Sequence, residues 1–583
     1  MTGATTRSFA IGETDFLLDG EPFRVLSGAL HYFRVHPGQW ADRIRKARLM
    51  GLNTIETYVA WNAHEPVRGE WDATGWNDLG AFLDLVAAEG MHAIVRPGPY
   101  ICAEWHNGGL PVWLTALEGV GLRRSEPTYL AEVTAYLERV YEIVVPRQID
   151  RGGPVILVQI ENEYGAYGDD TAYLEHLVKV TTDAGITVPL TTIDQPTDQM
   201  LSDGSVAGVH LTGSFGSRAA ERLATLRRHQ PTGPLMCAEF WDGWFDWWGS
   251  HHHTTSAADS AAELDALLAA GASVNFYMVH GGTNFGLTNG ANHKGRYLPI
   301  VTSYDYDAPL DERGDPTEKF FAFRDVIAKY APVPDEVPAP SGPAPQFEVA
   351  LSAVAAGVEA SVTRHDTPPT FEDLGHLSAL VSYEADLGGR AGVLRFGEVR
   401  DQAWVSVDGV SVGTLSRTRH EDALVVPAGE RVRVLVEEQG RVNYDSRLGE
   451  PKGLIGGVTL DGEPLSGWTA TAVDVAVLGA AVTDAAPPAM PNAGVAPFVL
   501  RGSFALESAT DLFLDSTGWG KGYALVNGFL LGRYWSSGPQ RTLYVPAAAL
   551  RAGENVLVLI ELDRVVAQTA RFVAEPDLGP LEE

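Results

Sequence analysis

The sequence predicts a multidomain protein in which a (β/α)₈ barrel, or TIM barrel, is followed by two all-β domains. Three observations lead to this fold class. Apolar strand-like runs alternate with helical patterns through residues 1–332, two proline-rich stretches interrupt the chain after them, and a valine-rich hairpin pattern occurs twice in the remainder. A chain of 583 residues is also too long for one hydrophobic core, so several domains are expected.

The barrel is predicted from eight apolar runs that lack the alternation of half-buried strands. The runs cover residues 24–30, 53–58, 92–97, 155–160, 188–192, 209–215, 235–240 and 273–279. Helical patterns lie between them, at residues 40–50, 79–89, 171–184, 219–228 and 257–270. Eight strands with intervening helices are typical of the barrel. A doubly wound open sheet is the alternative, which the lack of a glycine-rich nucleotide loop after the first strand disfavours.

The two proline-rich stretches set the predicted domain boundaries, because dense proline resists both helix and central strand. We predict the barrel over residues 1–332 and a linker over 333–346. A first β-sandwich is then expected over residues 347–482, a second linker over 483–497, and a second, jelly-roll β-sandwich over 498–583.

The two β-sandwiches are predicted to be related to each other. Valines alternate around the turn Asp408-Gly409, which is a hairpin signal, and a similar apolar pattern surrounds Asn527-Gly528. A proline follows each turn glycine at the same spacing, at Pro427 in the first copy and Pro546 in the second. Two copies of one module are the simplest explanation.

Composition and charge restrict the partners of the protein. The net charge of -32 would repel nucleic acid and anionic membranes, so neither is expected as a partner. No apolar run reaches the length of a membrane span, and residues 1–16 lack the pattern of a signal peptide, so a cytoplasmic location is expected. The two cysteines, Cys102 and Cys237, are too few for a disulfide framework or a zinc cluster.

Carboxylates gather where three predicted barrel strands end. Glu163 follows the fourth strand, Glu239 ends the seventh, and Glu104 follows the third. The carboxyl ends of barrel strands open onto one mouth, where catalytic groups are found. Tryptophans also lie in loops at strand ends, where they either stack on a sugar or pack the barrel rim: Trp61, Trp105, Trp241, Trp244, Trp247 and Trp248.

Paired carboxylates beside aromatic rings favour glycoside hydrolysis, in which one acid protonates the leaving oxygen and the other meets the developing oxocarbenium ion. Metal-dependent hydrolysis fits less well, because no His-Glu-x-x-His spacing occurs. The run His251-His252-His253 is interpreted as a solvated loop in preference to a metal site. We therefore expect no metal and no cofactor.

Several sequence blocks extend this interpretation. Residues 152–164 read Gly-Gly-Pro-Val-Ile-Leu-Val-Gln-Ile-Glu-Asn-Glu-Tyr, and further blocks lie at 56–66, 96–105, 281–286 and 302–310. Together they resemble the signature of family 35 glycoside hydrolases, the β-galactosidase family. The resemblance covers the barrel and reaches the β-modules through residues 527–535, so it also implies galactose-binding-like domains.

The resemblance implies a retaining, exo-acting enzyme that removes terminal β-galactose through a covalent galactosyl-enzyme. Glu163 would be the general acid/base and Glu239 the nucleophile. Other residues match positions that hold the galactose: Tyr58, Cys102, Ala103, Glu104, Asn162, Trp244 and Tyr306. Asn162 would contact the 2-hydroxyl, and Glu161 is expected to give a supporting hydrogen bond rather than to act in catalysis.

Two alternatives remain open at this stage. Relatives in the same family act on β-glucosaminides, so the sugar is not decided by the resemblance. A non-catalytic carbohydrate-binding protein is the second alternative, which intact Glu163 and Glu239 disfavour. The partner is expected to be a small-molecule or oligosaccharide β-galactoside, and the β-modules offer surfaces for a homo-oligomer.

Overall fold

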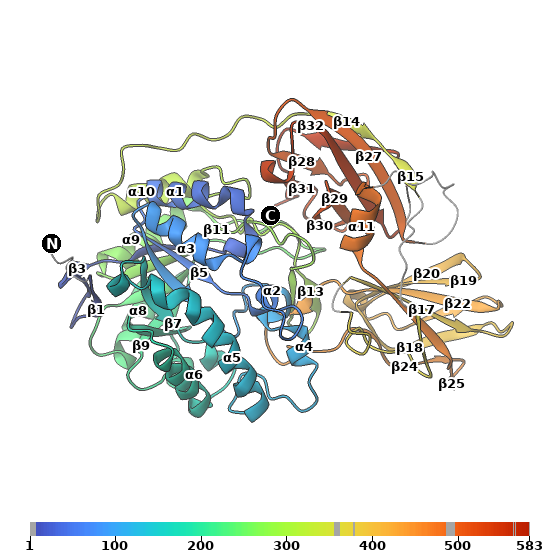
Figure 1. The fold of residues 1–583 in the computed structure, drawn as a ribbon, viewed down its shortest axis with the longest axis horizontal. Coiled ribbons are helices and arrows are strands. Elements are labelled where there is room, and N and C mark those ends of the chain that lie inside the picture. The colour runs from blue at the N-terminus through green and yellow to red at the C-terminus, as the bar shows by residue number, and fades with distance from the viewer. Residues whose placement is uncertain are drawn as a thin grey trace.

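A computed structural model describes residues 7–354, 362–376, 379–484, 496–563, 565 and 567–581 of the chain. Residues 1–6 of the amino terminus and residues 485–495, most of the second predicted linker, lie outside the described part. Figure 1 shows a barrel with helices around it and two separate all-β domains packed beside it. Among the described residues, no helix is both long and apolar enough to cross a membrane.

The barrel is closed and consists of eight parallel strands in the order β10-β11-β4-β5-β6-β7-β8-β9. Their bounds are β4 Leu26–Leu30, β5 Thr54–Tyr58, β6 His92–Arg96, β7 Val155–Gln159, β8 Leu190–Asp194, β9 His210–Ser214, β10 Met236–Trp241 and β11 Ser273–His280. Each predicted run overlaps one of these strands, so the predicted fold class is confirmed. All five residues of β7 are buried, as the apolar run at this position indicated.

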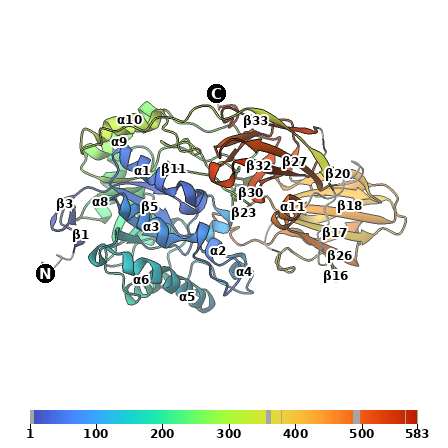
Figure 2. The same cartoon turned by 45° about the horizontal axis from the view of Figure 1, so that its top comes forward.

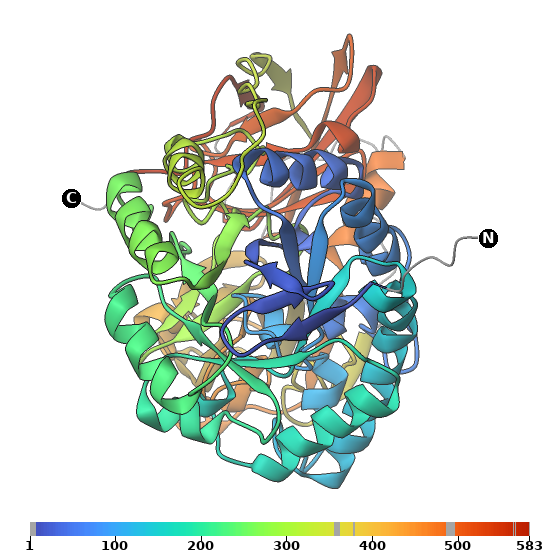
Figure 3. The same ribbon diagram turned by 90° about the vertical axis from the view of Figure 1, so that its left-hand side faces the viewer.

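Helices surround the barrel (Figure 3). The longer ones are α1 Trp40–Met50, α3 Leu79–Ala88, α5 Pro127–Val144, α6 Thr171–Asp183, α8 Ala219–His229, α9 Ala257–Ala269 and α10 Glu318–Ile327. The five predicted helices are present, whereas α5 and α10 were not predicted. A small sheet of β1 Phe9–Ile11, β2 Phe16–Leu18 and β3 Glu21–Phe23 covers the amino-terminal end of the barrel, where Phe16 packs against His210 at the start of β9.

The first all-β domain contains two antiparallel sheets that enclose a separate hydrophobic core. One sheet has the order β16-β26-β17-β22-β19-β20 and the other β21-β18-β24-β25. The bounds are β16 Val362–His365, β17 Leu380–Asp386, β18 Gly392–Arg400, β19 Gln402–Val407, β20 Val410–Ser416, β21 Ala423–Val426, β22 Arg431–Glu437, β24 Gly453–Leu460, β25 Glu463–Pro464 and β26 Trp468–Val473.

The second all-β domain is discontinuous in sequence, which corrects one predicted boundary. Its sheets have the orders β14-β33-β28-β31 and β15-β27-β32-β29-β30. The bounds are β14 Phe347–Ala350, β15 Ser352–Val354, β27 Phe498–Leu506, β28 Leu512–Asp515, β29 Lys521–Val526, β30 Phe529–Trp535, β31 Thr542–Val545, β32 Gly553–Glu561 and β33 Thr569–Val573. Residues 347–354 therefore belong to this domain and not to the first sandwich, because they complete sheets whose other strands come after residue 497.

The predicted pair of hairpins occupies equivalent places in the two domains. In each domain the hairpin lies at the edge of a sheet, in the order β22-β19-β20 or β32-β29-β30. Each hairpin has a bulge at the same point, after Val405 in the first domain and after Ala524 in the second. The turn residues Asp408 and Asn527 both adopt positive φ, which their short polar side chains tolerate.

A second small sheet joins the barrel to the first all-β domain. It has the order β13-β12-β23, in which β12 Gly290–His293 and β13 Tyr297–Pro299 follow the barrel and β23 Arg441–Val442 belongs to the all-β domain. In Figure 2, β23 lies between the barrel and the two all-β domains. The two parts of the chain therefore share backbone hydrogen bonds as well as side-chain contacts.

We expect Phe572→Ala to destabilise the second all-β domain by about 3–5 kcal/mol, because the ring fills a buried site between remote strands. Phe572 on β33 is 2% exposed, and its ring centre lies 4.7 Å from that of Phe347 and 5.1 Å from that of Phe504. Calorimetry should show a lower unfolding temperature. Val425→Ala, at a 71% exposed position, is the control and should leave the transition unchanged. An unaltered transition in Phe572→Ala would contradict the placing of β14 against β33.

Candidate active site

One pocket opens at the carboxyl ends of the barrel strands, and the predicted site residues all line it. They are Tyr58, Cys102, Ala103, Glu104, Asn162, Glu163, Glu239, Trp244 and Tyr306. They come from loops or strand ends that are remote in sequence, and closure of the barrel brings them together. The pocket therefore combines carboxylates, an amide and aromatic rings, which is the composition expected of a sugar site.

Glu239 near the end of β10 is surrounded by hydrogen-bond donors. Its Oε1 accepts hydrogen bonds from the hydroxyl of Tyr58 at 2.7 Å and pairs with the Arg96 guanidinium, also at 2.7 Å. The indole of Trp241 donates to Oε2 at 3.2 Å. Donors to both oxygens stabilise the negative charge of the carboxylate, so this side chain is suited to act as an ionised group.

Glu163 lies in a contrasting environment. It follows β7 in a left-handed turn, with φ of 43°, and its carboxyl accepts a hydrogen bond from Ser214 Oγ at 2.5 Å. Burial and, to a lesser extent, the negative charge of Glu239 together raise the pKa of Glu163 to about 7. Glu163 is therefore suited to hold a proton near neutral pH while Glu239 carries charge.

The buried guanidinium of Arg96, at the end of β6, links several of these groups. It pairs with Glu239, donates to Asn162 Oδ1, and lies 3.4 Å from Glu56 Oε1. Burial raises the pKa of Glu56 to about 7, and the Arg96 charge opposes this shift. Arg96 belongs to the block 96–105 but was not predicted as a site residue, because its contacts are made with residues of other strands.

The loop Cys102–Glu104 has an unusual backbone. All three residues adopt left-handed φ values, between 49° and 55°, without a glycine among them. The loop is held from several sides: Arg34 donates to the Ala103 carbonyl at 2.5 Å, and Gly290 N donates to the Glu104 carbonyl at 2.8 Å. Such a conformation persists only where its surroundings determine it, and it directs Glu104 into the pocket. Burial raises the pKa of Glu104 to about 7, while the Tyr304 hydroxyl, 2.5 Å away, acts in the opposite direction.

Glu161 does not line this pocket. Both of its oxygens bind the buried guanidinium of Arg123, at 3.0 and 2.7 Å, and Tyr173 donates to it at 2.8 Å. Arg123 also donates to the carbonyl of Asn162 at 2.7 Å. The bidentate pair thus supports the turn that carries Asn162 and Glu163, which agrees with the supporting role expected of Glu161.

Only some of the tryptophans in the strand-end loops reach the pocket. Trp241 and Trp244 line it, and Trp244 stacks on Phe245 with ring centres 5.0 Å apart. Trp61, in contrast, is 1% exposed and stacks on Tyr136, and Trp105 is buried beside Phe33. The rim-packing interpretation therefore holds for these two side chains.

Further residues line the pocket that the sequence analysis did not select. They are Ile101, Gln195, Phe245, Tyr277, Asn292, Lys294 and Tyr444. Gln195 directly follows β8, so its position after a predicted strand was a usable signal. Tyr444 comes from the first all-β domain, and no local pattern indicates that it reaches the barrel.

Two residues of the histidine run are less exposed than the predicted solvated loop would place them. His252 and His253 are half-buried, and their Nδ1 atoms lie 2.7 and 2.8 Å from the two oxygens of Asp246. His251 alone is exposed. Within the described part of the chain, no cluster of three or more His, Cys, Asp or Glu side chains could hold a metal ion.

Comparison with known proteins gives the family. The model of glycosyl hydrolases family 35 matches residues 15–330. The chain belongs to this family. The models of the first all-β domain and the galactose-binding domain of β-galactosidases match residues 368–474 and 497–555. The protein is therefore a glycoside hydrolase of the β-galactosidase type.

Curated relatives match nearly the whole chain. The β-galactosidase of Xanthomonas manihotis is 39% identical over 561 residues, covering 93% of this chain and 92% of its own. The β-galactosidase of Bos taurus is 39% identical over 622 residues, covering 98% and 94%. The β-galactosidase-1-like protein of Mus musculus is 39% identical over 596 residues, covering 97% and 91%.

We expect Arg123→Met to destabilise the barrel by about 3–5 kcal/mol, because it leaves the Glu161 carboxylate buried without a cation. The double variant Arg123→Met with Glu161→Leu removes both charges and should recover much of this loss. Thermal unfolding of the wild type and both variants measures the difference. If the double variant is no more stable than the single one, the ion pair does not support the turn.

Proposed function

We propose that the protein is a retaining exo-β-galactosidase that releases terminal non-reducing β-D-galactose through a covalent galactosyl-enzyme. The observation that carries this proposal is the contrast between the two acids of one pocket. Glu239 receives donors on both oxygens, whereas burial raises the pKa of Glu163 to about 7. One group is thus prepared to attack and the other to donate a proton.

In the first step, the Glu239 carboxylate attacks the anomeric carbon of the galactoside while protonated Glu163 donates its proton to the glycosidic oxygen. The bond from the anomeric carbon to the aglycone oxygen breaks, and the aglycone leaves as an alcohol. Retention requires the two carboxyl groups to lie about 5–5.5 Å apart in the productive complex. The Coulombic influence of Glu239 on the pKa of Glu163 is consistent with such close placement.

In the second step, the Glu163 carboxylate takes a proton from water, and the water oxygen attacks the anomeric carbon. The bond to Glu239 breaks, so galactose is released with its original anomeric configuration. Arg96 and Tyr58 would stabilise the Glu239 carboxylate as it departs, because both already donate to its Oε1.

The remaining predicted residues would bind the galactose. Asn162 would contact the 2-hydroxyl, where a hydrogen bond strengthens in the transition state. Glu104 and the backbone of Cys102 and Ala103 would bind other hydroxyls, and Tyr306 and Trp244 would provide hydroxyl and ring contacts.

The cytoplasmic location and a homo-oligomeric state stay predictions of the sequence. Cell fractionation tests the first, and light scattering tests the second.

The experiment compares nitrophenyl β-galactoside, β-glucosaminide and β-fucoside as substrates for the wild type and for Glu239→Gly. We expect the galactoside to be preferred and Glu239→Gly to lose at least about 10³-fold in kcat, because the covalent route is closed. Azide should restore turnover in this variant by attacking the anomeric carbon in place of the carboxylate.

Glu221→Gln is the control, since the side chain of this acid on α8 is 63% exposed and lies outside the pocket. It should retain most of the turnover number once folded. A preference for glucosaminide would refute the galactose assignment, and full activity in Glu239→Gly would refute the nucleophile. Sugar binding without turnover in the wild type would favour a carbohydrate-binding protein.

We expect kcat/KM to fall as the pH rises above about 7, because Glu163 donates a proton only while it is protonated and its pKa is raised to about 7. The decline should approach tenfold per pH unit. A dinitrophenyl galactoside, whose leaving group needs little protonation, should show a weaker decline. A pH profile measured on Glu163→Ala should lack the alkaline limb, and an unchanged limb would assign it to another group.

A further inference from the structure

The first all-β domain sends one segment, residues 438–452, across to the barrel. The segment leaves the end of β22 and returns at the start of β24. On the way, Arg441 and Val442 of β23 pair in parallel with Gly290 and Ala291 of β12. The backbone N–H of Asn443 continues this ladder by donating to the Ala291 carbonyl at 2.9 Å. The segment thus adds a strand to the β12–β13 hairpin.

The middle of this segment, at Asn443 and Tyr444, reaches the catalytic pocket. The carbonyl of Asn443 accepts a hydrogen bond from Tyr100 at 2.6 Å, and its amide lies 3.6 Å from the sulfur of Cys102. Tyr444 lines the pocket itself. The neighbouring β12–β13 hairpin contributes Asn292 and Lys294 to the same wall. One wall of the pocket therefore depends on where the all-β domain holds this segment.

The left-handed loop Cys102–Glu104 also depends on it. The loop is held by Gly290 N on the Glu104 carbonyl, and Gly290 is paired in turn with Arg441. Three successive residues with left-handed φ are unfavourable without such support. If the segment shifted, the loop that presents Glu104 to the substrate would be free to relax.

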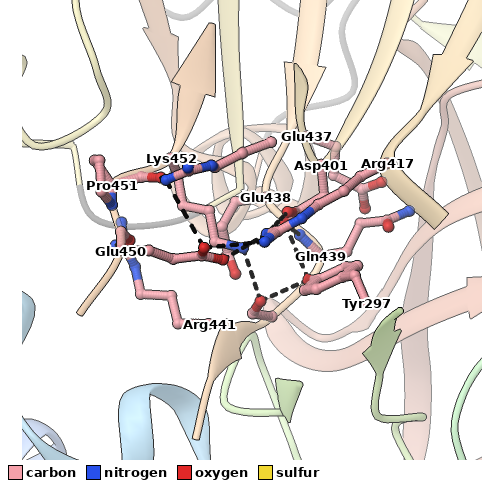
Figure 4. Close-up of polar contacts among 12 residues, drawn as sticks. Tyr297, Asp401, Arg417, Glu437, Glu438, Gln439, Arg441, Glu450, Pro451 and Lys452 are labelled. Carbon is pink, nitrogen blue, oxygen red and sulfur yellow. Dashed lines mark hydrogen bonds and ion pairs between the residues drawn. The ribbon is translucent and has the colours of Figure 1, made fainter. Parts of the chain in front are cut away.

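The two ends of the segment, at residues 439–440 and at Lys452, are held by a buried charge cluster (Figure 4). Lys452 and Asp401 have fully buried side chains, with Lys452 Nζ 2.6 Å from Asp401 Oδ2. Lys452 also donates to the carbonyl of Gly440 at 3.0 Å, and the Gln439 N–H donates to Asp401 at 3.1 Å. Arg417 binds the second oxygen of Asp401 at 2.9 Å.

The barrel joins the same cluster through Tyr297 on β13. Its hydroxyl lies 2.6 Å from the Gly440 carbonyl and 2.9 Å from Asp401 Oδ2. Gly440 is thus bound from both sides, by Lys452 of the all-β domain and by Tyr297 of the barrel. A buried ion pair is weak evidence for stability, since apolar side chains of similar volume often serve as well. Its directional hydrogen bonds do, however, select one position of Gly440.

We propose that Asp401 and Lys452 are positioning residues, which hold the segment 438–452 so that Asn443 and Tyr444 fix the outer wall of the pocket and the loop Cys102–Glu104. The first all-β domain is then a part of the catalytic unit rather than an appendage. This inference rests on the proposed function, because it assigns the loop and wall to substrate binding. Asp401 and Lys452 do not themselves line the pocket.

The test uses the full chain with Lys452→Met, Asp401→Asn and the milder Tyr297→Phe. Arg395→Gln is the control, because Arg395 pairs with Asp422 on the exposed surface of the same domain. KM and kcat are measured with the glycoside that the wild type cleaves best, together with inhibition by galactose. Hydrogen–deuterium exchange of residues 100–107 and 290–294 is measured in parallel and does not depend on activity.

We expect KM and the galactose inhibition constant to rise about tenfold in Lys452→Met and Asp401→Asn, with kcat within about threefold of the wild type and the pH profile unmoved. Exchange of both segments should accelerate. Tyr297→Phe should show the same changes at smaller size, which keeps the test decisive if a charge variant fails to fold. Arg395→Gln should match the wild type.

Unchanged exchange in folded variants overturns the proposal, whatever the substrate proves to be. A lower unfolding temperature with unaltered KM and inhibition constant also overturns it, since that would show a merely structural role. Failure of the wild type to prefer a galactoside refutes the proposed function instead, and the exchange of the two segments still decides the positioning role.

Discussion

The arrangement of the site depends on one buried cation, the guanidinium of Arg96. Several buried acids lie in or beside the pocket, and burial raises the pKa of Glu56, Glu104 and Glu163 to about 7. Buried acids that lie near one another each disfavour ionisation of the others. The Arg96 guanidinium lies 2.7 Å from Glu239 and 3.4 Å from Glu56. Its positive charge therefore acts more strongly on Glu239 than on Glu56. The difference between the two acids is therefore built into the barrel before any substrate binds.

Much of the barrel could be predicted from the sequence because its strands are buried on both faces and appear as short, unbroken apolar runs. The run at 155–160 and the strand Val155–Gln159 differ by one residue for this reason. The carboxyl ends of such strands then located Glu163 and Glu239. Helix Pro127–Val144 was not predicted, although its buried residues recur at helical spacing.

Other features could not be predicted, because they depend on pairing between remote segments. Strand Phe347–Ala350 was assigned to the first sandwich, yet it pairs with Thr569–Val573 at the other end of the chain. Nothing in four residues of alternating polarity specifies so distant a partner. Tyr444 is the corresponding case in the site: its role comes from the ladder between Arg441 and Gly290, not from its own neighbours in sequence. Local sequence patterns thus locate the strand ends, whereas the residues of the outer pocket wall can be identified only from the tertiary structure.

The second all-β domain takes part in the same junction, which explains why the three domains form one body. Arg533 of β30 is buried, donates to the Glu438 carbonyl at 2.7 Å and also binds Asn289 Oδ1 of the barrel. Its own carbonyl accepts a hydrogen bond from Thr302 at 2.7 Å. Tyr523 of the same domain donates to Glu437 at 2.8 Å, directly before the segment that reaches the pocket. Because a buried guanidinium is costly to leave without acceptors, displacement of any one domain would remove at least one acceptor of Arg533. The junction therefore opposes independent movement of the domains, and the pocket wall is held in place by the barrel and both all-β domains together.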